Sequence, residues 1–135
     1  MTVLVDTNVL LDIVSSDPIW LEWSITRVRE ALGSGAVVID SVIYAELSVG
    51  LDSVEAVDAV LSETGVTMVE TPRFALFLAG KTFHEYKKRG GPRTGVLPDL
   101  FIGAHASAAR IPLITRDARR YRSYFPDLKL ITPHQ

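Results

Sequence analysis

The sequence predicts an α/β protein with a three-layer α/β/α fold, in which helices cover both faces of a parallel sheet. Five apolar, β-branched runs of strand length alternate with longer segments of helical spacing, and this alternation is typical of right-handed βαβ units. The runs are apolar throughout rather than at every second position, which indicates strands that are buried on both faces.

The expected elements extend along the whole chain. Strands are expected at residues 3–5, 36–39, 66–69, 112–115 and 128–131. Helices are expected at residues 7–14, 18–32, 41–49, 53–64, 72–88 and 98–109. Asp17-Pro18 can begin the second helix and Gly33 can end it, while Ser41 and Gly50 can delimit the third. The segment RGGPRTGV at residues 89–96 is too rich in Gly and Pro for a helix, so we expect a mobile loop there.

The composition excludes several classes of protein. With 135 residues and a mass of 14.8 kDa, the chain has the length of one domain, residues 1–135. It contains no cysteine, which excludes disulfide bonds, thiolate metal sites and a cysteine nucleophile. The apolar N-terminus carries Asp6 and Asp12 and no basic leader, and no segment has the length and apolarity of a membrane span. We therefore expect a soluble, cytoplasmic protein.

The charges are distributed unequally between the two halves of the chain. Residues 1–70 carry two arginines and twelve acids, whereas residues 71–135 carry twelve lysines and arginines and four acids. This asymmetry favours contact with nucleic acid or with an oppositely charged partner. The alternative is that ordinary helix surfaces differ by chance.

Acidic residues stand where the expected strands end. Asp6 follows the first strand, Asp117 follows the fourth, and Asp99 lies in the first turn of the helix at 98–109. Glu46 lies within a helix, but helical side chains point back toward the helix N-terminus and so toward the same edge. Singly, such acids are often helix caps or first-turn residues. Together the four predict an acidic site at the carboxyl edge of the sheet, where open α/β sheets bind ligands.

Four carboxylates at one edge repel one another and require a neutralising proton or cation. Oxygen ligands without His or Cys select Mg²⁺ or Mn²⁺, which can activate a water for in-line displacement at phosphorus. We expect Asp6 and Asp99 to be direct metal ligands, Asp117 to share this ion or a second one, and Glu46 to act through water. Asp12 is left outside the site because it lies on the opposite side of its helix from Asp6, and Asp40 because it adjoins a helix cap.

Four motifs resemble those of PIN-domain ribonucleases. They are DTNVLLD at residues 6–12, SVIYAEL at 41–47, LPDLFIGAHA at 97–106, and LITRD at 113–117 followed by RYRSYFP at 120–126. They occur in the family's order, and the similarity extends from about residue 2 to residue 133. Within the family the chain looks most like the VapC toxins of toxin–antitoxin pairs.

The resemblance implies a metal-dependent endoribonuclease, often homodimeric, that a cognate VapB antitoxin holds inactive. It also implies a five-stranded parallel sheet and an acidic pocket made by Asp6, Glu46, Asp99 and Asp117, all of which are present. Thr7, Asn8 and Thr115 match the polar positions that support these acids. Their hydroxyl and amide groups can fix the carboxylates, although Thr115 can equally be an ordinary strand-end residue.

Basic residues flank two of the acids and predict an RNA-binding rim, because RNA is held mainly by its phosphates. Lys87, Lys88, Arg89 and Arg93 precede Asp99, and Arg116, Arg119, Arg120 and Arg122 surround Asp117. The aromatic residues Tyr121, Tyr124 and Phe125 could stack on bases, but packing on the core is the commoner role. Trp20, Trp23 and Val28 could likewise line a groove for an antitoxin helix or belong to the core. His84, His105 and His134 show no catalytic placement.

Three alternatives to a ribonuclease toxin come from the same residues. The first is a PIN-fold scaffold that binds RNA without cleaving it, and the second is a housekeeping RNA-processing nuclease. The third is a receiver-like phosphoacceptor, which would need a lysine at the carboxyl end of the last strand. Lys129 stands near the beginning of that strand, which argues against this role.

Overall fold

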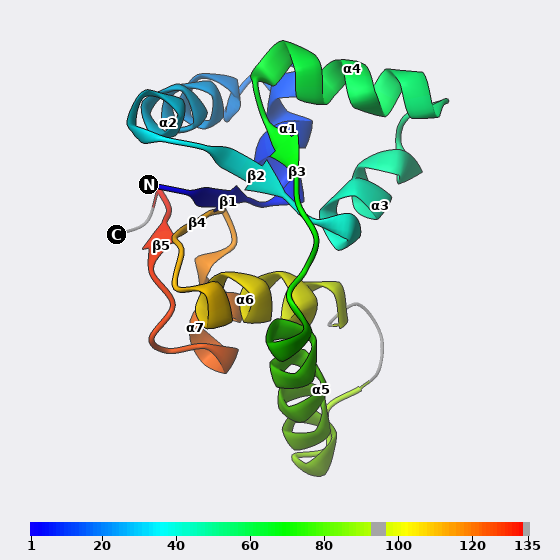
Figure 1. The fold of residues 1–135 in the computed structure, drawn as a ribbon, viewed down its shortest axis with the longest axis vertical. Helices are drawn as coiled ribbons and strands as arrows, with labels where there is room; N and C mark the ends of the chain where they lie inside the picture. Colours follow the sequence, from blue (N-terminus) through cyan, green and yellow to red (C-terminus); the bar gives the residue numbers. More distant parts are fainter. Residues whose placement is uncertain (93–96, 134–135) are drawn as a thin grey trace.

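The computed structural model describes residues 1–92 and 97–133, so Arg93 of the expected RNA-binding rim, the second half of the expected loop at 89–96 and His134 lie outside the described residues. Figure 1 shows the order of the elements. The strands are β1 (Val3–Val5), β2 (Val37–Ile39), β3 (Thr67–Met68), β4 (Leu113–Ile114) and β5 (Leu130–Ile131). The helices are α1 (Thr7–Val14), α2 (Leu21–Ser34), α3 (Ser41–Val49), α4 (Val54–Thr64), α5 (Arg73–Lys88), α6 (Leu97–Ala109) and α7 (Ala118–Tyr124).

The five strands form one parallel sheet in the order β3-β2-β1-β4-β5. The central strand β1 pairs with β2 through Leu4 and Val38 and with β4 through Leu4 and Leu113. All three strands are buried along their length, as continuous apolar runs predict. The predicted α/β class and the five-stranded parallel sheet are therefore confirmed.

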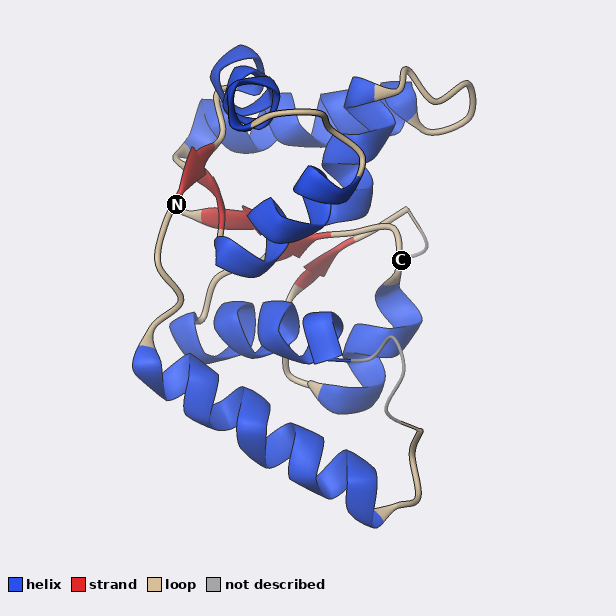
Figure 2. Cartoon of the chain, turned by 90° about the vertical axis from the view of Figure 1, so that its right-hand side faces the viewer, coloured by secondary structure: helices blue, strands red, loops and turns tan. Residues whose placement is uncertain are grey.

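Helices cover both faces of the sheet (Figures 1 and 2). In Figure 1, α1, α2 and α4 lie above the sheet, whereas α6 and α7 lie below it and α5 packs on α6. Helix α3 lies at the end of the sheet and contacts both α1 and α6. Because α1 to α4 come from residues 1–70 and α5 to α7 from residues 71–135, one layer is rich in acids and the other in lysine and arginine.

Local interactions explain most helix boundaries and some small differences from the expected ones. Asp40, not Ser41, caps α3, because its carboxylate accepts hydrogen bonds from the backbone N–H groups of Val42 and Ile43 at 3.1 Å each. Helix α2 continues past Gly33 and ends at Ser34. At the end of α4, Gly65 adopts the left-handed conformation with φ +79°, which a glycine accommodates without strain.

Helix α7 was not expected from the sequence. It has seven residues, and only Ala118 and Tyr121 of it are buried. The helix packs against α6 at Gly103, where an added Cβ would lie 2.5 Å from the Phe125 ring and 3.0 Å from that of Tyr121. The absence of a side chain at Gly103 thus allows Tyr121 to reach the carboxyl edge of the sheet.

Candidate functional site

Asp6 is the most deeply placed acid at the carboxyl edge of the sheet. It follows β1, caps α1 and is 5% exposed. Its Oδ1 accepts a hydrogen bond from the Thr7 N–H at 2.7 Å, and its Oδ2 accepts one from the Thr115 hydroxyl at 2.7 Å and one from the Tyr121 hydroxyl at 3.0 Å. The carboxylate therefore accepts hydrogen bonds from the residue that follows it and from two residues of the C-terminal part of the chain, and these bonds fix its rotamer.

Burial determines the acidity of Asp6. Desolvation raises the pKa of this carboxyl to about 6, and the negative charge of Asp99 adds to the increase. The hydrogen bonds from Thr115, Tyr121 and Thr7 act in the opposite direction but do not compensate. Ionisation of Asp6 is therefore unfavourable in the protein alone, and a bound cation would stabilise the ionised form.

Tyr121 links Asp6 to Asp99. Its hydroxyl lies 3.0 Å from Asp6 Oδ2 and 3.5 Å from Asp99 Oδ1. Burial raises the pKa of Tyr121 well above its usual value, and the charges of Asp6, Asp99 and Glu46 contribute. Asp6 and Asp99 therefore contact one neutral hydroxyl, and Glu46 is close enough for its charge to act on it. We call Asp6, Asp99, Glu46 and Tyr121 the Tyr121 cluster.

Glu46 joins this cluster from α3. The Thr7 hydroxyl donates a hydrogen bond to Glu46 Oε1 at 2.5 Å, while the Thr7 N–H donates to Asp6. Thr7 thus holds two acids at once, which is consistent with the supporting role that the sequence predicts for it. Asn8 is placed similarly, with its Nδ2 3.4 Å from both Asp6 Oδ2 and the Thr115 hydroxyl.

Asp117 stands apart from the Tyr121 cluster. Its side chain is exposed and does not cap α7. Its backbone N–H donates to the Thr115 hydroxyl at 3.0 Å, and Thr115 in turn donates to Asp6, so Thr115 connects the two acids. The carboxylate lines a shallow hollow with Arg116, Arg119 and Arg122. Asp117 therefore lies at the rim of the site, beside three of the predicted RNA-binding arginines.

The cluster suits a hard divalent ion that keeps part of its water shell. Within residues 1–92 and 97–133, no three acidic or histidine side chains lie close enough together to hold one ion. Asp6 and Asp99 nevertheless approach the same hydroxyl, and all donors there are oxygen atoms. Mg²⁺ commonly binds one or two carboxylates and completes its shell with waters and substrate phosphates. The residues present therefore fit Mg²⁺ or Mn²⁺, with Asp6 and Asp99 as the acids that approach the same hydroxyl.

Arg120 forms an ion pair with Asp99. Its Nη1 lies 2.5 Å from Asp99 Oδ2, and the side chains are 50% and 18% exposed, respectively. The hydrogen bond to Asp99, followed by the negative charge of that residue, raises the pKa of Arg120, so this guanidinium stays charged. Arg120 thus lies on the site itself, whereas the sequence predicts only that it belongs to the RNA-binding rim.

A second acid–arginine pair lies deeper in the molecule. Arg116 donates to both oxygens of Asp12, from Nε at 2.7 Å and from Nη2 at 3.0 Å. Asp12 also accepts a hydrogen bond from the Ser24 hydroxyl at 2.7 Å, and the guanidinium carbon lies 5.0 Å from the Trp20 ring centre. The sequence predicts Arg116 as an RNA ligand and leaves Asp12 aside, but in the structure these two residues bind each other.

Asp40 and His105 form a buried contact between α3 and α6. Asp40 Oδ2 lies 2.9 Å from His105 Nδ1, and the residues are 0% and 3% exposed. The contact joins the helix that carries Glu46 to the helix that carries Asp99. His105 is thus a buried histidine, and it has a polar partner that the sequence does not indicate.

The remaining basic candidates are surface residues. Lys87 and Lys88 lie in the last turn of α5, Arg89 follows them, and Arg119 and Arg122 lie on α7, all exposed. Tyr121 and Phe125 are buried, so packing rather than base stacking describes these two aromatic residues. Of the described helices, none has the length and apolarity that a membrane span requires.

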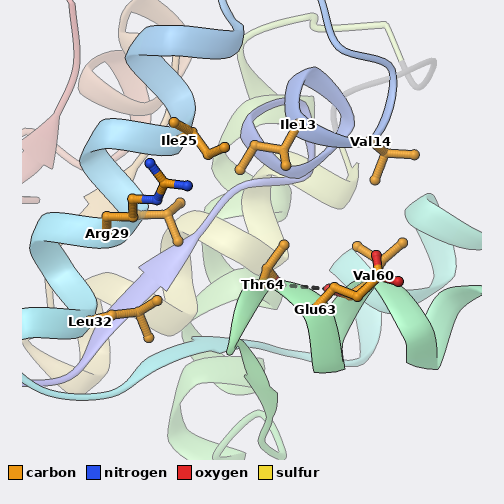
Figure 3. Close-up of a pocket in the computed structure, with 9 residues that line it drawn as sticks. Ile13, Val14, Ile25, Arg29, Leu32, Val60, Glu63 and Thr64 are labelled. Carbon is orange, nitrogen blue, oxygen red and sulfur yellow. Dashed lines mark hydrogen bonds between the residues drawn. The ribbon is translucent and has the colours of Figure 1, made fainter.

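A separate apolar hollow lies between α1, α2 and α4 (Figure 3). It has a volume of about 300 Å³, and its apolar lining is formed by Ile13, Val14, Ile25, Val28, Leu32 and Val60. Arg29 and Glu63 lie at its margin. Val28 lines it as the sequence suggests, but Trp20 and Trp23 do not: their rings pack edge to face at 6.3 Å elsewhere on α2.

Comparison with known proteins identifies the class. The model of the PIN domain matches residues 3–126, so the chain belongs to the PIN-domain family. A comparison with curated proteins found no match.

Solved structures that share the fold include one named a toxin–antitoxin complex, from Klebsiella pneumoniae. The chain is similar to one in VapBC2 from Rickettsia felis bound to a promoter DNA fragment, with a TM-score of 0.75 and 20% identity over 98% of each chain. VapBC-1 from nontypeable Haemophilus influenzae gives a TM-score of 0.72 and 23% identity over 98% of each chain. FitAcB from Neisseria gonorrhoeae gives 0.69 and 18%, over 98% of this chain and 99% of the other. At these identities the likeness establishes the shared fold.

Proposed function

We propose that the protein is a Mg²⁺- or Mn²⁺-dependent endoribonuclease, the VapC-type toxin of a toxin–antitoxin pair. The observation that carries the proposal is the approach of Asp6 and Asp99 to one buried hydroxyl at the carboxyl edge of the sheet. Oxygen-only ligands beside an exposed basic surface suit the hydrolysis of a phosphodiester polymer.

Each acid has a proposed role. Asp6 and Asp99 would hold the ion, Asp117 would share it or bind a second one, and Glu46 would act through a bound water. The ion, when bound, supplies an activated water and stabilises the leaving oxygen. Thr7 and Thr115 keep Glu46 and Asp6 in place through the hydrogen bonds described above. Lys87, Lys88, Arg89, Arg93, Arg119 and Arg122 would bind RNA phosphates.

The proposed partner is a VapB-type antitoxin, since the structures that share the fold include VapBC proteins and one named a toxin–antitoxin complex. The hollow between α1, α2 and α4 suits an apolar helix of that partner, with Arg29 and Glu63 at its margin to pair with charges of either sign. We further propose a homodimer that acts in the cytoplasm. Val14 lines the hollow and is 40% exposed, so Val14→Glu should weaken antitoxin binding and leave RNA cleavage unchanged.

Cleavage of RNA with defined metal content tests the function. The purified protein should cleave RNA in Mg²⁺ or Mn²⁺ and stop when EDTA is added, and Asp6→Asn should abolish cleavage in a folded protein. Asp52→Asn, in an exposed loop between α3 and α4, is the matched control and should retain full activity. Full cleavage in EDTA would refute the metal mechanism. RNA binding without any cleavage would favour the scaffold alternative.

A further inference from the structure

The acids of the Tyr121 cluster have one cationic partner among the described residues, and it is Arg120. Its Nη1 contacts Asp99 Oδ2, while Asp99 Oδ1 faces the Tyr121 hydroxyl, which also donates to Asp6. A divalent ion held by Asp6 and Asp99 would therefore lie within a few ångströms of the guanidinium. Two positive charges at that separation repel strongly, and both are attracted to the same carboxylate.

We propose that Arg120 and the divalent ion compete for Asp99, so that Arg120 sets the affinity of the site for metal. This inference rests on the proposed function because it takes Asp99 as a metal ligand. It gives Arg120 a regulatory role in metal binding, in addition to the place in the RNA-binding rim that the sequence predicts for it. Because the Arg120 guanidinium already neutralises Asp99, a higher concentration of the divalent ion is needed to occupy the site.

The geometry of the pair favours exchange rather than a permanent contact. Arg120 is half exposed, and its Nη1 contacts one oxygen of Asp99. Arg116, by contrast, holds both oxygens of an acid whose side chain is 4% exposed. Because Arg120 is half exposed, water screens its pair with Asp99 and its long side chain loses entropy when it is held, so the pair gains little net free energy and a doubly charged ion can displace the guanidinium.

The test is a calorimetric titration with Mn²⁺ in the absence of RNA. Arg120→Gln should bind Mn²⁺ about tenfold more tightly than the wild type, because the competing charge is removed. Arg120→Lys keeps the charge and should remain within about threefold of the wild type. Arg119→Gln removes a neighbouring charge of α7 without an ion pair among the described residues, and should also remain within about threefold.

Two results would overturn the inference. Equal or weaker Mn²⁺ binding by Arg120→Gln would mean that Arg120 positions Asp99 rather than competing for it. An equal gain in Arg119→Gln would mean that the effect is one of general charge. The melting temperature gives a second reading, since Mn²⁺ should raise it more in Arg120→Gln than in the wild type. In an Asp99→Asn background, Arg120→Gln should change neither the Mn²⁺ affinity nor the rise in melting temperature. This double-mutant comparison isolates the interaction between Arg120 and Asp99.

The titration and the cleavage assay fail independently. Tighter Mn²⁺ binding by Arg120→Gln in a protein that cleaves no RNA would reject the nuclease and leave the competition intact. Unchanged Mn²⁺ binding in a protein that cleaves RNA would reject the competition alone. Absence of Mn²⁺ binding in both the wild type and Arg120→Gln would overturn the inference.

Discussion

Arg116 and Arg120 lie four residues apart, at the beginning and in the middle of the same segment, and each binds one carboxylate. The inner pair, Arg116–Asp12, joins this segment to α1, and its acid is buried and bound through both oxygens. The outer pair, Arg120–Asp99, joins the segment to α6 at the solvent boundary through a single hydrogen bond. Asp6 accepts hydrogen bonds from Thr115 and Tyr121 of the same segment and has no ion pair among the described residues.

The difference separates structural charge from functional charge. Two hydrogen bonds, the Ser24 hydroxyl and the Trp20 ring hold the inner pair in one arrangement. It fixes the chain beside Thr115, which in turn binds Asp6. The outer pair is exposed enough to be exchanged, and Asp6 has only neutral donors. We expect the inner pair to determine stability, and Asp6 with the outer pair to determine metal binding and activity.

Replacing the acid of the outer pair should have the largest effect, and it should fall on activity. Asp99→Asn should lower RNA cleavage by about a thousandfold, equivalent to about 4 kcal/mol, because it removes a proposed metal ligand. The free energy of unfolding should change by less than about 1 kcal/mol, as is usual for exposed pairs. Cleavage rates at saturating Mn²⁺ and urea unfolding in EDTA measure the two effects. A folded Asp99→Asn with wild-type turnover would contradict the ligand assignment.

Replacing the acid of the inner pair should give the opposite result. Asp12→Asn leaves the Arg116 guanidinium without its charged partner and should cost about 3 kcal/mol of unfolding free energy. Cleavage by the remaining folded protein should fall less than tenfold. Urea unfolding at pH 7 measures the loss, and Asp12→Asn combined with Arg116→Met should recover part of it, since no partly buried cation then remains. A loss below about 1 kcal/mol would show that the inner pair is not a structural contact.

The sequence predicts the fold better than it predicts these contacts. Apolar runs and helix spacing are local, so they identify the five strands and place Asp6, Glu46, Asp99 and Asp117 relative to the sheet edge. The contact between Arg116 and Asp12 spans 104 residues, and nothing local distinguishes Arg116 from the exposed Arg119. Helix α7 buries too few side chains to give a periodic pattern. Its Tyr121 reaches Asp6 only because Gly103 admits it.

The pH dependence of stability should sharpen the contrast between Asp6 and the paired acids. The pKa of Asp6 is raised from 3.8 to about 6, so between these values the folded protein binds more protons than the unfolded chain, and ionisation of Asp6 destabilises the fold. The contribution of Asp6 is therefore most favourable at low pH and is lost as pH rises through about 6. In EDTA, Asp6→Asn, which mimics the neutral acid, should gain about 1 to 2 kcal/mol relative to the wild type between pH 5 and pH 8. Urea unfolding at several pH values measures this difference, and a difference that does not vary with pH would mean that Asp6 titrates normally.

Removing the hydroxyl between Asp6 and Asp99 should have the smallest effect and test their connection directly. Tyr121→Phe deletes a donor to Asp6, so the pKa of Asp6 should rise further and unfolding should become easier by about 1 kcal/mol. Mn²⁺ requires the ionised carboxylate, so the pH at which Mn²⁺ affinity is half lost should move upward. Tyr44→Phe removes an exposed hydroxyl that binds Asp58 at 2.9 Å and should leave this midpoint unchanged. A midpoint that stays fixed in Tyr121→Phe would mean that Tyr121 does not stabilise the charge of Asp6. Asp6 and Asp99 would then not be connected through this hydroxyl.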